Sequence, residues 1–195
     1  MKRLLPLLLA LFASLTWGQT SHERRYELRP DPNWPLEIEL GTGDYQIVAS
    51  ASDSIAVVYD DGNAEAARNV EVQIGSGHGQ NHLKIVGQKL NFHASIEVPR
   101  KTDLRVRMSA GDLSIGDVEG NKDIEVVAGN LELNSLRPQD YAQADFSVRI
   151  GDVYAPLLKA ARSGPLRSFK SAGPGKYRLH AHVGVGDLTL RTNAI

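Results

Sequence analysis

The sequence predicts an all-β protein, a short single-domain β-solenoid of stacked short strands joined by Gly-Asp turns. Between Ile96 and Leu133, apolar and polar residues alternate in runs of three to five, which is the period of a half-buried strand. Gly-Asp or Gly-Asn pairs open these runs, and the intervals from Gly111 to Gly129 and from Gly129 to Gly151 are 18 and 22 residues. These intervals are close to one solenoid coil of about 20 residues.

Composition favours the same fold. The 195 residues are 42% hydrophobic but only 6% aromatic, and 18 are glycine. Narrow stacks of short strands are filled by Val, Ile, Leu and Ala, whereas a bundle or sandwich core usually contains more large rings.

The Gly-Asp pairs have a turn chemistry of their own. Glycine adopts positive φ without steric cost, and an Asp or Asn after it can hydrogen-bond the backbone two residues on. We therefore expect these side chains to cap turns. The six expected caps are Asp44, Asp112, Asp117, Asn130, Asp152 and Asp187. Stacked carboxylates could instead bind calcium, but these are single and unevenly spaced, which favours capping.

The N-terminus is typical of a secretory signal peptide. Met1-Lys2-Arg3 precedes a short apolar run, and small residues follow near Gly18. We predict a signal peptide over 1–18, with an uncleaved membrane anchor as the alternative. A polar leader with little regular structure is expected over 19–35, where three prolines flank Trp34, and the solenoid domain over 36–195. The chain has no cysteine, so its core must hold without disulfides.

Strand periodicity begins at Leu36 and continues to Leu190. The expected strands before the Gly-Asp repeats are 36–40, 45–47, 55–59, 70–74, 83–85 and 92–98. Residues 36–90 form either a separate sheet or the first coils of the solenoid. The interval from Gly151 to Gly186 is 35 residues, which indicates one coil plus an insertion around Pro156–Pro174, or a degenerate coil. The last strand, Leu188–Leu190, is expected to be an exposed solenoid end.

No residues of this sequence make a convincing catalytic or metal site. His180 and His182 share one face of a strand, but they alternate with apolar residues, so we place them on the solvent face without a metal. The glycine-rich stretch containing His78 and His82 is predicted to be a flexible hairpin loop rather than a phosphate cradle, because a strand follows it. We therefore expect no cofactor, no metal and no enzymatic activity.

Charge disfavours two classes of partner. Without Lys2 and Arg3 the chain has 20 basic and 23 acidic residues, a net charge of -3. A chain near neutrality has no electrostatic footprint for nucleic acid or for an anionic membrane surface.

Several short motifs resemble the bacterial putative-adhesin domain family. They are the Val98-Pro99 pair, the following strand Asp103-Leu104-Arg105-Val106, and the repeated Gly-Asp-hydrophobic-x-hydrophobic units between Phe92 and Leu190. The resemblance implies a right-handed β-solenoid in an extracytoplasmic module, without an established activity.

The expected function follows from this resemblance. We expect a non-catalytic exported module, periplasmic or at the cell surface, that binds an envelope or cell-surface polymer or protein. The exposed strand residues it would use are Arg105, Arg107, Glu125, Glu132, Arg149 and Arg178. The alternatives are a periplasmic assembly module that forms homo-oligomers by end stacking, and, more remotely, a polysaccharide-cleaving enzyme.

Overall fold

The computed structural model describes residues 23–60, 70–86, 92–156 and 160–191, so the predicted signal peptide lies outside the described residues. These ranges contain strands and one 3-10 helix, η1 (Pro138–Asp140), but no α-helix, which confirms the all-β prediction. The strands are β1 (Glu23–Leu28), β2 (Leu36–Thr42), β3 (Asp44–Ser50), β4 (Ile55–Asp60), β5 (Glu71–Gly77), β6 (Gln80–Val86), β7 (His93–Pro99), β8 (Leu104–Gly116), β9 (Lys122–Asn134), β10 (Tyr141–Ala155), β11 (Ala160–Ala172), β12 (Tyr177–Val185) and β13 (Leu188–Leu190).

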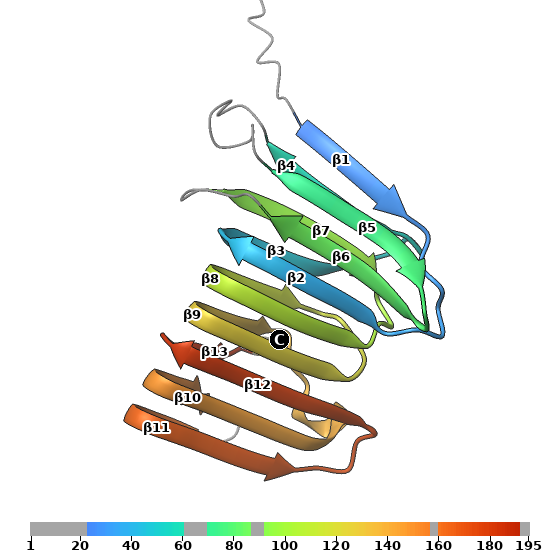
Figure 1. Cartoon of the computed structure of the whole chain (residues 1–195). Helices are drawn as coiled ribbons and strands as arrows, with labels where there is room; N and C mark the ends of the chain where they lie inside the picture. The colour runs from blue at the N-terminus through green and yellow to red at the C-terminus, as the bar shows by residue number, and fades with distance from the viewer. Residues whose placement is uncertain (1–22, 61–69, 87–91, 157–159, 192–195) are drawn as a thin grey trace, which may run out of the picture.

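The strands stack in two layers that share one core (Figure 1). The first layer has the order β5-β6-β2-β8-β9-β12-β10-β11, and the second has the order β1-β4-β7-β3-β8-β9-β13-β10-β11. The long strands β8, β9 and β10 appear in both layers because each bends halfway, so that its first part pairs in one layer and its second part in the other. All pairings from β2 to β10 in the middle of the stack are parallel.

The bends coincide with glycines of positive φ. Gly111, Gly129 and Gly151 have φ of 110°, 129° and 137°. Gly43, between β2 and β3, and Gly186, between β12 and β13, occupy the equivalent positions in the stack. Successive glycines touch: a Cβ atom on Gly129 would lie 1.8 Å from the carbonyl oxygen of Gly111. We call this series, in the spatial order Gly43, Gly111, Gly129, Gly186 and Gly151, the glycine column.

The glycine column shows that spatial order differs from chain order. Leu179 of β12 pairs with Lys122 of β9 and with Ala144 of β10, so β12 lies between strands that are consecutive in sequence. Leu188 of β13 likewise pairs with β9 on one side and β10 on the other. The prediction that Leu188–Leu190 is an exposed solenoid end is therefore wrong, because β13 is an interior strand.

The expected insertion between Gly151 and Gly186 is the strand β11. It runs antiparallel along β10 through both layers, from Ala160 opposite Ala155 to Ala172 opposite Gln143. β11 thus ends the stack, and the chain then returns to fill the position between β9 and β10. An extra degenerate coil is not what the structure shows here, because β11 pairs only with β10 among the described strands.

Residues 36–86 belong to the same core rather than to a separate sheet. β2 and β3 form a first coil on β8, the antiparallel β5–β6 hairpin extends the first layer, and β7, β4 and β1 extend the second. The hairpin turn is His78-Gly79, with φ of 54° and 82°, so the hairpin is confirmed; the predicted loop is shorter than expected, because Gly75 belongs to β5 and His82 to β6. Both positive φ values are typical of the tight two-residue turns that join antiparallel strands.

The predicted leader over 19–35 contains one strand that the sequence pattern does not indicate. β1 pairs antiparallel with β4, and Tyr26 stacks on Tyr59 with ring centroids 6.2 Å apart. Its sequence, ERRYEL, is mostly charged. Because β1 is an edge strand, few of its side chains need to be apolar, so the period-2 signal is weak.

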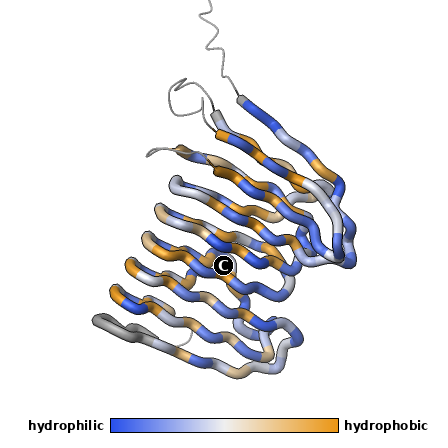
Figure 2. The backbone as a smooth tube through the Cα atoms, in the orientation of Figure 1, coloured by the Kyte–Doolittle hydropathy of each residue, from blue (hydrophilic) through white to orange (hydrophobic). Residues whose placement is uncertain are grey.

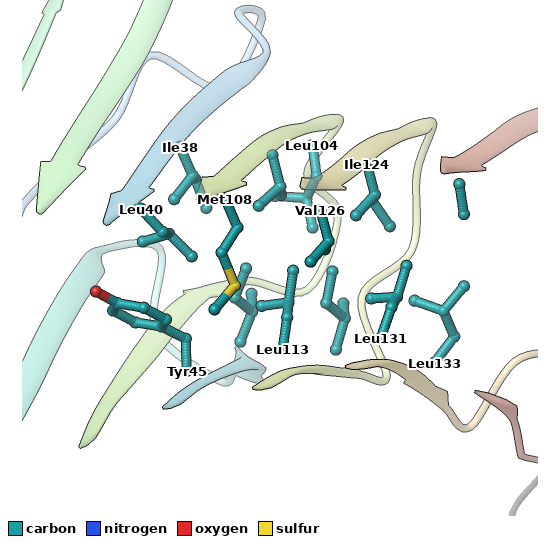
Figure 3. Close-up of a cluster of buried hydrophobic side chains, with 14 of the residues drawn as sticks. Ile38, Leu40, Tyr45, Leu104, Met108, Leu113, Ile124, Val126, Leu131 and Leu133 are labelled. Carbon is teal, nitrogen blue, oxygen red and sulfur yellow. The ribbon is translucent and has the colours of Figure 1, made fainter. Parts of the chain in front are cut away.

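Inward side chains of the two layers interdigitate along the stack (Figure 3). Ile38 and Ile124 are fully buried in the first layer, and they face Leu113 and Leu131 of the second. Apolar and polar residues alternate along most of the coloured strands in Figure 2, as expected for one buried face per layer. Removal of this apolar surface from water is the main favourable term in the stability of the stack.

Substitution of a column glycine should unfold the stack. We expect Gly129→Ala to cost about 3 kcal/mol or more, because it adds both backbone strain at positive φ and a clash with the Gly111 carbonyl. The matched control is Gly77→Ala, whose Cβ would meet nothing within 4 Å. Chemical denaturation of both variants tests this, and equal stabilities would contradict the steric role of the column.

Candidate functional site

Five of the six expected caps lie in one row beside the glycine column. The amide of Asp112 donates to Asp44 Oδ1 (3.3 Å), the side-chain amide of Asn130 donates to Asp112 Oδ1 (2.9 Å), and the amide of Asp187 donates to Asn130 Oδ1 (3.1 Å). The amide of Asp152 donates to Asp187 Oδ1 (2.9 Å). These side chains thus bridge neighbouring coils, whereas the expected bonds ran within each turn.

The sixth expected cap, Asp117, lies elsewhere. It follows β8 at the opposite edge of the layers, has φ of 53°, and forms an ion pair with Arg100 at 2.5 Å. Gly116-Asp117 is therefore not a member of the column. Among the described residues, no group of three His, Asp or Glu side chains is placed to hold a metal ion.

The outer face of the first layer carries charges that neutralise one another. Arg107 contacts Asp123 at 2.8 Å and Glu125 at 3.2 Å, and Arg105 lies 3.7 Å from Asp123. Lys84 pairs with Glu39 further along the same face. Cross-strand pairs of this kind stabilise a sheet by roughly 0.2–1 kcal/mol each, so we assign these residues to sheet pairing rather than to ligand capture.

The other residues expected to bind ligand are dispersed. Glu132 lies on the second layer and pairs with Arg191 at 2.8 Å, while Arg149 and Arg178 are exposed on β10 and β12, close to the β11 end. His180 and His182 face solvent between buried neighbours, as predicted, and His182 Nδ1 lies 2.8 Å from Ser147 Oγ.

A groove lies at the edge opposite the glycine column. It has a volume of about 910 Å³ and is formed mainly by three connections, 29–35, 50–53 and 99–103. Ligand sites in proteins usually occupy roughly 300–1,000 Å³ and combine apolar walls with a few polar groups. Trp34 and four prolines supply much of the apolar part here, and Arg29, Asp53 and Lys101 supply charged groups.

Asn81 fixes the wall of this groove. Its side chain is 1% exposed, its Oδ1 accepts from the Asp31 amide (2.9 Å) and from Ser76 Oγ (2.7 Å), and its Nδ2 donates to the carbonyls of Asp31 and Trp34. The Asp31 carboxylate in turn accepts from the amide of Asn33 (2.9 Å). The segment that carries Trp34 is therefore held before any ligand arrives.

Sequence analysis missed Asn81, although a signal exists. In the run Asn81-His82-Leu83-Lys84-Ile85, Asn81 shares the inward face with Leu83 and Ile85. A polar residue at an inward position of a strand must find hydrogen-bond partners inside the protein. The same reasoning identifies Lys122, which shares its face with Ile124 and Val126.

Lys122 is a buried cation near the groove, beside a small cavity. Its Nζ donates to the Val118 carbonyl (2.7 Å), to the Gly120 carbonyl (3.3 Å) and to Tyr141 Oη (2.6 Å). Burial lowers the pKa of Lys122 from 10.5 to about 8, against the opposing effect of Asp103, Asp140 and Glu119. The cavity holds about 20 Å³, which is room for one water and not for a substrate.

Lys122 should make stability depend on pH. Because the unfolded lysine binds its proton up to pH 10.5 and the folded one only to about 8, stability should rise by about 2 kcal/mol from pH 8 to pH 10. Above pH 10 the buried Tyr141, whose pKa is raised by burial, opposes this rise. Urea unfolding of the wild type and of Lys122→Met at pH 8, 9 and 10 should show the rise only in the wild type. The control is Lys176→Met, an exposed lysine; a rise that persists in Lys122→Met would refute this assignment.

The fold is similar to that of a solved structure described as a putative cell adhesion protein from Clostridium sporogenes. The match has a TM-score of 0.52 at 12% sequence identity and covers 89% of this chain and 100% of that one. The resemblance to the putative-adhesin family, predicted from the Gly-Asp repeats, is thus confirmed for the fold.

A second solved structure is less similar to this chain. A putative adhesin from Parabacteroides distasonis matches over 59% of this chain and 58% of its own, with a TM-score of 0.26 at 11% identity. No protein-family model and no curated protein matches the sequence. No helix among the described residues is long and apolar enough to cross a membrane.

Proposed function

We propose that this protein is an exported, non-catalytic binding module that captures an envelope or cell-surface polymer or protein, as an adhesin does. The observation that carries the proposal is the groove at the edge opposite the glycine column, with its wall held by Asn81. Preorganisation of this kind raises affinity, because the loop does not lose conformational freedom when ligand binds.

The remaining features agree with this proposal. The name of the Clostridium sporogenes protein refers to cell adhesion, and the Met1–Gly18 segment has the pattern of a secretory signal. The parallel stack bent at a glycine column has the construction of a short β-solenoid, which we take to be right-handed. A rigid repeat scaffold that presents a loop-built site is a common arrangement for binding proteins.

The groove replaces the strand faces as the proposed binding surface. Arg105, Arg107 and Glu125 are engaged with charged neighbours on the sheet, whereas Trp34 lines the groove. Aromatic side chains in partly enclosed sites contribute much of the affinity in typical interfaces.

Co-sedimentation of the mature chain with bacterial envelope fragments tests the proposal. We expect Trp34→Ala to weaken retention about tenfold, because loss of one anchor aromatic ring typically costs 1–2 kcal/mol or more. Gln46→Ala, at an exposed position on the outer face of the second layer, should retain wild-type binding.

Thermal unfolding of both variants establishes that they remain folded. If Trp34→Ala binds as well as the wild type, the groove is not the binding site. If Trp34→Ala loses binding only because it unfolds, binding of the conservative variant Trp34→Phe is compared with that of the wild type instead, since this variant keeps an aromatic ring.

A further inference from the structure

The near-neutral total charge conceals two ends of opposite sign. The described residues among 23–99 include ten acidic and four basic ones, whereas the described residues among 141–191 include three acidic and seven basic ones. The first range supplies β1 to β7, and the second supplies β10 to β13. Because spatial order places β1 and β5 at one end of the stack and β11 at the other, charge is segregated along the stack.

The positive end is the one that β11 closes. From Pro156 to Gly186 the sequence has six Lys or Arg and no Asp or Glu. β11 itself includes Arg162, Arg167 and Lys170, and Lys176 lies in the turn before β12. A group of basic residues with few acidic neighbours creates a local positive potential even when the whole protein is slightly acidic.

Of the exposed basic side chains described at this end, only Lys170 forms an ion pair, and this pair is longer than those in the middle of the sheet. Lys170 is 78% exposed and lies 4.0 Å from Asp145, the limit of an ion pair. Arg149, Lys176 and Arg178 are exposed and form no ion pair with another described residue. We call Arg149, Lys170, Lys176 and Arg178 the basic end.

The spacing of these residues exceeds what one small anion can bridge. Arg178 pairs with Gln143 on β10, and Lys170 pairs with Asp145 from the other side of β10, so two strand spacings, about 10 Å, separate their strands. Arg149 lies four residues beyond Asp145, about 13 Å along β10. Several anionic groups on one extended chain can contact all of these positions.

We propose that the basic end binds a linear polyanionic glycan, a polysaccharide whose repeating units carry carboxylate or phosphate groups. Such a contact would tether the protein to an anionic envelope polymer through its last strands, while the part of the groove formed by the connections 29–35, 50–53 and 99–103 stays open to its own ligand. This second surface does not depend on the groove, so either can fail without the other. Charge complementarity is the basis of the contact, and its strength should therefore fall as salt rises.

Titration of the mature chain with polygalacturonate and with long-chain polyphosphate tests the proposal. At about 50 mM salt we expect binding to polygalacturonate, the glycan of the two, and a loss of about tenfold or more in the double variant Lys170→Glu/Arg178→Glu. The matched control, Arg25→Glu/Lys84→Glu, makes the same change in net charge in the acidic half and should change binding less than about threefold.

Three results would overturn the proposal. Equal losses in the two double variants would show that net charge, not the basic end, controls binding. Binding to vesicles that contain anionic lipid but to neither polymer would identify a membrane surface instead. Absence of binding to both polymers at low salt would leave the basic end without a ligand of this class. Trp34→Ala should bind both polymers like the wild type, which separates this surface from the groove.

Discussion

Close contact between backbones at the glycine column is the constraint on which the rest of the structure depends. Each bend brings a carbonyl oxygen to within 2.0 Å of where the next glycine's Cβ would be, from Gly111 onward through Gly129, Gly186 and Gly151. No residue with a side chain fits at these positions. The column therefore fixes how neighbouring coils align and where the two layers meet. The Asp and Asn side chains beside it then join neighbouring coils through hydrogen bonds.

Because of this constraint, the surfaces of the molecule differ in how strongly their residues are fixed by strand pairing. The middle of the outer face is fixed by parallel pairing and fills its polar positions with mutually compensating charges such as Arg107 and Glu125. The edge opposite the column carries only connections, which can vary in length without disturbing the core. The groove with Trp34 forms there, and it is stabilised from inside by the buried side chain of Asn81. The last strand of the stack, β11, has no partner beyond it in the described structure, and the exposed cations of the basic end lie on it or beside it.

Much of the fold could be predicted because its signals are local. Period-2 alternation and Gly-Asp pairs specify strands and bends within a few residues, so the changes of direction at Gly111 and Gly129 could be predicted. The order of coils in space was not, because the placement of β12 and β13 between β9 and β10 depends on pairing over long sequence distances. The groove was missed for the same reason: Asn81 contacts Asp31 across 50 residues. The charged faces were predicted as exposed, but only the register revealed that Arg105 and Arg107 lie beside Asp123.

Disulfide formation between introduced cysteines tests most directly whether the last coil occupies the interior of the stack. The chain has no cysteine of its own, and Thr189 pairs with Glu132 on one side and with Tyr154 on the other. Under mild oxidation, Glu132→Cys/Thr189→Cys should form an intramolecular disulfide, whereas Glu132→Cys/Tyr154→Cys should not, because two strand spacings of about 4.8 Å exceed the Cα separation a disulfide allows. Efficient bonding of the second pair and none of the first would mean that the coils stack in chain order, contrary to this account.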